Sequence, residues 1–111
     1  MNAVEEIQVD INEAKETIEV MESLNRLVKN KDFNKIISEG YFKEEAYRLV
    51  HLKAAPAMQG EERQAALVKA MDAIGCLQQH FHMIFVKGEQ AQDALLQGDI
   101  ALEEMAMEGD I

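Results

Sequence analysis

Apolar side chains recur along the first part of the chain in alternating steps of three and four residues. The repeating positions are Val4, Ile7, Ile11, Ala14, Ile18, Met21, Asn25 and Val28. This spacing is an a/d heptad repeat, in which one narrow face of a helix packs against a partner helix. Asn25 is its polar member, and an asparagine at an a position can fix register or oligomer state. We predict a long helix over residues 1–30, with this N-terminal seam as its pairing surface.

A second heptad repeat runs through the last part of the chain and contains no charged residue. Its positions are Leu67, Ala70, Ile74, Leu77, Phe81, Ile84, Gly88, Ala91, Leu95, Gly98, Leu102 and Met105. This C-terminal seam predicts a long helical segment over residues 60–108. A glycine inside a helix costs about 1 kcal/mol relative to alanine, so we expect a bend or break near Gly88. Residues 81–86 also suit a strand, but the chain offers no strand partner, which favours helix.

The middle of the chain, residues 31–56, predicts two short helices. The first begins near Asp32, with a side-chain cap available just before it, and Gly40 suits its C-cap because glycine adopts the left-handed conformation easily. The second follows at once and ends before Pro56, since a residue that precedes proline is disfavoured in a helix.

Gly40, Tyr41 and Phe42 are then a predicted helix corner, with both rings filling the end of a bundle. The scarcity of glycine and proline favours helix throughout. We therefore predict one all-α domain over residues 1–111. It is a helical bundle in which long N- and C-terminal heptad-patterned helices enclose the two short middle helices.

The chain carries a formal net charge of −10, from 21 acidic and 11 basic side chains. Seven acids and no base lie between Gly88 and residue 111. A polyanion repels phosphate, so we predict no direct nucleic-acid binding. The acids favour solubility, with a basic protein partner as the alternative. No apolar stretch is long enough to cross a bilayer and no signal peptide is recognisable, so we expect a soluble protein without membrane contact.

The side chains that could carry chemistry form no recognisable site. His80 and His82 are two residues apart, so on a helix they point in different directions and cannot share a metal ion. Cys76 lies among apolar neighbours, where we expect a buried, unreactive thiol. Adjacent acidic residues diverge on a helix and stay solvated, which disfavours acid–base catalysis. We therefore predict a non-enzymatic protein without catalytic residues, cofactor or metal.

Two stretches of the sequence resemble a group of small acidic helical proteins encoded by tailed bacteriophages. They are residues 32–50, above all Gly40-Tyr41-Phe42-Lys43-Glu44-Glu45-Ala46, and residues 73–81. Such proteins are often encoded among virion structural and morphogenesis genes. The resemblance implies a role in head, tail or packaging assembly, in the host cytoplasm during infection and in association with the virion. It carries over no catalytic residue.

Together these features predict a phage structural or assembly protein that acts through helix–helix contacts. We expect a homo-oligomer that also contacts other virion proteins. An acidic adaptor or inhibitor that binds a host protein is the alternative. The seams predict that helices pair, but they leave open whether the partner of the N-terminal seam belongs to the same chain or to another copy.

Overall fold

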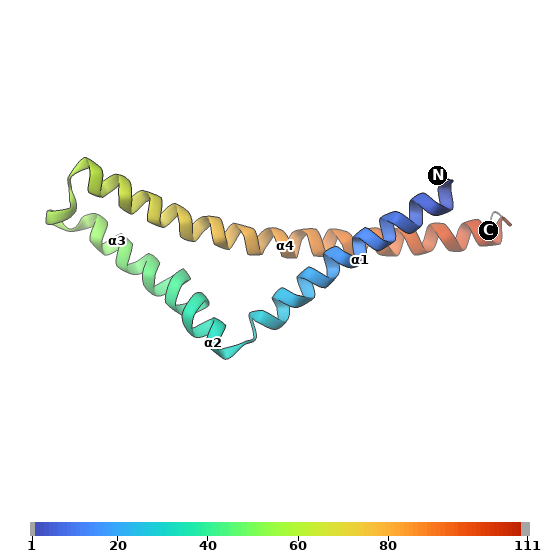
Figure 1. Ribbon diagram of the computed structural model, residues 1–111, viewed down its shortest axis with the longest axis horizontal. Coiled ribbons are helices and arrows are strands. Elements are labelled where there is room, and N and C mark those ends of the chain that lie inside the picture. Colours follow the sequence, from blue (N-terminus) through green and yellow to red (C-terminus); the bar gives the residue numbers. More distant parts are fainter. Residues whose placement is uncertain (1, 110–111) are drawn as a thin grey trace. The chain divides into compact units, whose positions relative to one another are not determined.

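The computed structural model describes residues 2–109, and these residues are almost entirely helical (Figure 1). Helix covers 92% of them and they contain no strand. The elements are α1 (Ala3–Leu27), α2 (Lys31–Phe33), the π-helix η1 (Asn34–Glu45), α3 (Ala46–Ala54), the 3₁₀ helix η2 (Pro56–Met58) and α4 (Glu61–Met107). The all-α prediction is confirmed, as are the long first and last helices. Residues 81–86 are helical and lie within α4.

The chain divides into two compact units. The terminal unit combines the described residues of Met1–Leu24 and Met83–Ile111, and the central unit is Asn25–His82. α1 and α4 each contribute to both units, because the divisions fall within these two helices. The single-domain organisation of the chain stays a prediction.

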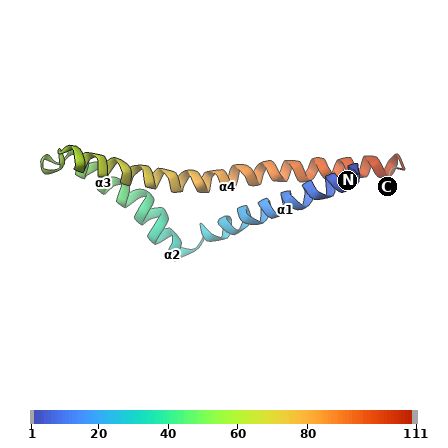
Figure 2. The same ribbon diagram turned by 45° about the horizontal axis from the view of Figure 1, so that its top comes forward.

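In the terminal unit, α1 lies beside the second half of α4 and runs antiparallel to it (Figure 2). Met21 of α1 lies against Gly88, and Ile11 lies against Gly98. The second contact thus lies ten residues earlier in α1 and ten residues later in α4, as expected for antiparallel helices. The partner of the N-terminal seam in this unit is therefore the C-terminal seam of the same chain.

The two seams fit because large side chains on one helix meet small residues on the other. A Cβ atom on Gly98 would lie 2.9 Å from Cγ1 of Ile11, and one on Gly88 would lie 2.6 Å from Cβ of Met21. The same antiparallel register places Ala14 opposite Leu95 and Ile18 opposite Ala91. Ile11, Ala14, Met21, Gly88 and Ala91 are buried. The glycines thus let the α1 side chains enter spaces on the surface of α4.

Of the predicted bend or break near Gly88, the break is wrong, because α4 runs from Glu61 to Met107 without interruption. The local cost of a helical glycine is about 1 kcal/mol. Backbone hydrogen bonds on both sides and the packing of α1 outweigh that cost. Gly88 is buried beneath Met21, so its missing side chain serves the helix contact.

In the central unit, the two predicted middle helices form one helical run. Asn30 caps its start, with Oδ1 accepting a hydrogen bond of 2.9 Å from the Phe33 N–H. α2, η1 and α3 then follow one another without a turn until Ala54. The helix ends before Pro56, as predicted, with Ala55 between them in an extended conformation.

The predicted helix corner at Gly40, Tyr41 and Phe42 is therefore wrong. Gly40 has no left-handed backbone and lies inside η1. A π-helix closes i→i+5 hydrogen bonds and is wider than an α-helix. A Cβ on Gly40 would lie 2.9 Å from the carbonyl oxygen of Lys35, five residues earlier. This glycine fits the wider helix and does not end a helix.

The π-helix also explains why two adjacent rings face inward. Phe33, Ile37 and Tyr41 follow a four-residue spacing, Leu49 lies eight residues after Tyr41, and all four are buried or half-buried. In an α-helix of 3.6 residues per turn, this repeat would drift around the helix axis. The wider π-helical turns offset that drift. Tyr41 and its neighbour Phe42 can then both pack towards the core of the central unit.

The core of the central unit lies between the middle helices and the first half of α4. Its buried side chains are Leu49, Leu67 and Ile74, and half-buried Tyr41, Phe42, Ala46, Leu52, Met58, Ala70 and Met71 pack against them. The ring of Phe81 adds a second contact, with centroids 6.0 Å from Phe33 and 5.8 Å from Phe42. These edge and tilted ring arrangements are favourable for aromatic pairs. They hold α2 and the later part of η1 against α4.

Two glycine substitutions in α4 test the close contact. Gly88→Ala gains about 1 kcal/mol of helix propensity, but the new methyl group overlaps Met21, and overpacking costs about 1–3 kcal/mol. We expect a net loss of roughly 1 kcal/mol in the free energy of unfolding, measured by urea denaturation. Gly75→Ala is the matched control, because no atom lies within 4 Å of a Cβ there. It should stabilise the protein by about 0.5–1 kcal/mol.

A double-mutant cycle of Met21→Ala and Gly88→Ala gives the interaction free energy between the two positions. The double variant should be more stable than the sum of the single changes indicates, because the smaller Met21 replacement leaves room for the new methyl group. Additive effects, or an equal gain from both glycine substitutions, would contradict the contact between Gly88 and Met21.

Candidate interaction surface

The N-terminal seam is not an open surface in this structure. Its predicted site residues are each buried or half-buried: Val4, Ile7, Ile11, Ile18, Met21, Asn25 and Val28. The first part of the seam is covered by α4 in the terminal unit. Surfaces available to a partner must therefore be sought on the other helix faces.

A shallow groove of about 670 Å³ runs between α1 and α4 in the terminal unit. Small residues line much of it, namely Ala14, Ala91, Ala94, Gly98 and Ala101, together with Ile7. Its polar lining includes Asp10, Glu13 and Lys87. The groove could receive small apolar side chains from another helix, but its shape alone does not select a partner.

α4 carries a separate stripe of exposed apolar side chains near its C-terminal end. Leu96, Ile100 and Met107 are 57%, 40% and 89% exposed. Their spacings of four and seven residues place them on one helix face, away from the C-terminal seam. Exposed Asp93, Glu103 and Glu104 flank this face. We call these six residues the acidic stripe, and sequence reasoning missed it.

Charge is divided very unequally between the two units. Of the 21 acids and 11 bases, the terminal unit holds 14 acids and two bases, and the central unit holds seven acids and nine bases. The terminal unit therefore carries a formal net charge of −12, whereas the central unit carries +2, and together they give the −10 of the chain. A charged partner would meet two surfaces of opposite character on one chain.

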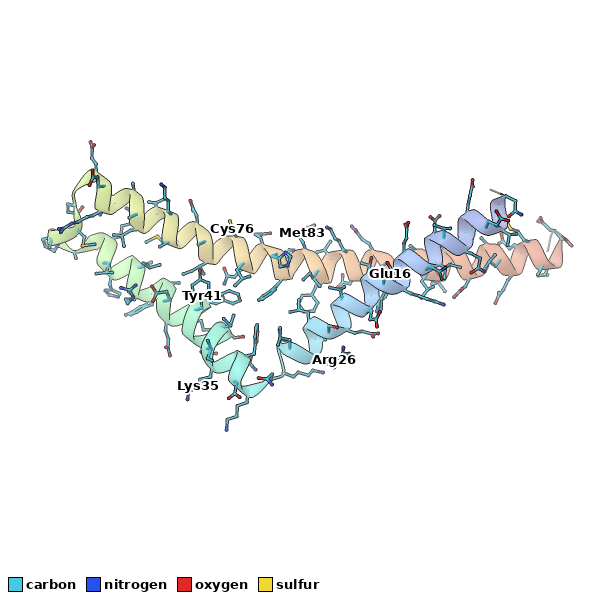
Figure 3. The ribbon with its side chains drawn as sticks, viewed as in Figure 1. Glu16, Arg26, Lys35, Tyr41, Cys76 and Met83 are labelled. Atoms are coloured by element: carbon cyan, nitrogen blue, oxygen red, sulfur yellow. The ribbon has the colours of Figure 1, made fainter. Side chains whose placement is uncertain are left out.

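Four of the nine bases of the central unit lie where α1 ends and the middle helices begin. Lys29, Lys31 and Lys35 are exposed there. Two exposed apolar side chains accompany them, since Leu27 is 43% and Ile36 is 64% exposed. We call these five residues the basic corner. Figure 3 shows Arg26 and Lys35 on the two helical segments that meet at it.

The outer side of α3 forms a further exposed patch. Tyr47 and Val50 are exposed, and the Tyr47 ring lies 4.4 Å from the His51 ring, centroid to centroid. Beside them, Arg48 donates a 3.0 Å hydrogen bond from Nε to Glu45 Oε2 and a second from its terminal nitrogen to Oε1. This two-point pair lowers the pKa of the Glu45 carboxyl below its ordinary value, through the hydrogen bonds first.

The other titratable side chains that the sequence singled out are dispersed. His80 and His82 are both exposed. Cys76 is also exposed, so the prediction of a buried thiol is wrong (Figure 3). The reason is helix geometry, because two positions after the buried Ile74 the chain points to the other side of α4. Within residues 2–109, no three His, Cys, Asp or Glu side chains are grouped to hold a metal ion.

No helix formed by the described residues is both long and apolar enough to cross a bilayer. Comparison of the chain with protein-family models, with curated proteins and with solved structures gives no match.

The Glu45–Arg48 pair predicts a small pH dependence. Because the folded pKa of Glu45 is depressed, its contribution to stability is present above the ordinary carboxyl pKa and is lost as pH falls through the folded value. In an NMR titration, Arg48→Gln should raise the Glu45 midpoint towards an ordinary glutamate. Lys53→Gln, a change to a nearby exposed base, is the control and should leave it in place. An unchanged midpoint in Arg48→Gln would contradict the pairing.

Proposed function

We propose that this protein is a non-enzymatic structural or assembly protein of a tailed bacteriophage that works through helix-to-helix contacts. Its place would be the host cytoplasm during infection, with association with the virion, and its partners would be further copies of itself and other virion proteins. The resemblance of residues 32–50 to small acidic phage proteins supports the phage setting.

One structural observation supports contact as the mode of action. The seams are used within the terminal unit, yet exposed apolar side chains remain on outer helix faces of both units, including Tyr47, Val50 and Leu96. Clustered exposed apolar side chains on helix faces are typical of surfaces that meet partners. Their flanking charges would give such contacts orientation and specificity.

The assembly role predicts where the protein is found. Mass spectrometry of purified virions and precursor particles, from a phage that carries the gene, should detect this chain at a defined copy number. The purified protein should self-associate at micromolar concentration in sedimentation velocity. A chain missing from both kinds of particle would contradict the role, with a known virion protein of similar size as the detection control.

A second function is supported by the charge of the terminal unit. With 14 acids against two bases, this unit is suited to bind a basic surface of a host protein, as an adaptor or inhibitor. Association of this kind depends on ionic strength, because the Debye length falls from about 30 Å at 0.01 M salt to about 8 Å at 0.15 M.

This alternative predicts a specific capture from host lysate. The protein should retain one host partner at low salt and lose it as salt rises. A variant with Asp93, Glu103 and Glu104 changed to the matching amides should retain less of that partner, because the amides keep size and remove charge. Equal capture by both proteins at every salt concentration would argue against this function.

A further inference from the structure

The acidic stripe and the basic corner are complementary in two respects. Each combines exposed apolar side chains with charges of one sign, but the signs are opposite. The stripe presents Leu96 and Ile100 beside carboxylates, and the corner presents Leu27 and Ile36 beside ammonium groups. We infer that the basic corner of one copy binds the acidic stripe of a second copy. This contact deepens the proposed assembly role and rests on it.

The acidic stripe is suited to a cationic partner of helical shape. The sequence has no base from Gly88 onward, so no cation of that segment neutralises Asp93, Glu103 or Glu104. Leu96 and Ile100 lie on one helix face between these carboxylates, and Met107 lies on the same face beyond Glu103 and Glu104. Charges around such a face orient a partner, and the apolar centre holds it.

The basic corner provides the matching chemistry. Its three lysines are spaced over the turn after α1, the start of α2 and the start of η1, at Lys29, Lys31 and Lys35. Asp32 is the one acid between residues 25 and 38, so the local balance is positive. Leu27 and Ile36 supply apolar contacts of the same kind as those on the stripe. Lysine stems can also cover apolar surface while their charged ends reach carboxylates.

A second copy is favoured over an unrelated basic protein because this chain carries both halves of the contact. Both surfaces are exposed within the chain. The contact joins different surfaces of the two copies, so each copy can use its corner on one neighbour and its stripe on another or on the same neighbour. Such an arrangement allows either a closed pair or a growing chain of copies, and both suit a protein of assembly.

Charge reversal on each surface gives the test. The first variant, K31E/K35E, reverses the corner, and the second, E103K/E104K, reverses the stripe. Glutamate and lysine have similar helix propensities, so the exposed helices should persist, which far-UV circular dichroism would check. The changes also agree with the helix dipole, since they place acids near a helix start and bases near a helix end.

Sedimentation velocity of the wild-type protein at low salt should show self-association that weakens by about tenfold or more at 0.5 M salt. Each variant alone should associate at least about tenfold more weakly than wild type at low salt. An equimolar mixture of the two variants should associate again, because a wild-type corner then meets a wild-type stripe, and the two reversed surfaces also match. Only a contact between copies gives this recovery.

The matched controls carry the same charge changes elsewhere. K53E/K69E reverses two exposed lysines of the central unit, and E16K/E19K reverses two exposed acids of α1. Both should associate like wild type. The inference is overturned by a wild-type protein that stays monomeric at low salt, by variants that associate like wild type, or by a mixture without recovery. Capture of a basic host protein in place of self-association also overturns it.

The virion measurement separates this contact from the assembly role. Recovery in the mixture, with the chain missing from virions and precursor particles, would support the contact and refute the role. Presence in the particles without recovery in the mixture would support the role and refute the contact.

Discussion

The close approach of α1 and α4 is the interaction on which the terminal unit depends. Two glycines on α4 leave space that Met21 and Ile11 of α1 occupy. Interior packing tolerates neither voids nor overlaps of even one methyl group, so a seam of large residues needs small ones opposite it. Gly88 and Gly98 provide this match at two points ten residues apart, and they thereby fix the antiparallel register.

That internal pairing determines which surfaces remain for partners. Once the seams face each other, a partner can reach only the sides and backs of the helices. On α4, the face turned away from the seam carries Leu96 and Ile100 among acidic side chains. At the end of α1, exposed Leu27 lies near lysines. The fold thus removes the most obvious oligomer surface in the sequence and leaves two smaller ones of opposite charge. Electrostatics then has a larger part in any association than the heptad pattern indicates.

The spacing of apolar residues predicted the two long helices and their inner faces, because both depend on spacing within one element. Asn30 and Pro56 act locally, so their effects could also be predicted. Asn30 caps the start of a helix with its side chain, and Pro56 disfavours helical backbone at the residue before it. Gly40 and Gly88 could not be interpreted in this way. A glycine ends a helix, fits a wider helix or makes room for a neighbour. The choice depends on the type of helix formed around it, as at Gly40, or on a helix distant in the sequence, as at Gly88.

The acidic stripe shows the same limit at the level of the candidate site. Leu96, Ile100 and Met107 have helical spacing, as the seam residues do, and hydrophobicity alone does not say which face α1 covers. The small residues of the seam, Ala91 and Gly98, are a better signal, because a helix that must be approached closely is covered on its small face. By that reasoning the larger side chains on the opposite face of α4 stay exposed. Their acidic neighbours then keep that face soluble until a surface of opposite charge meets it.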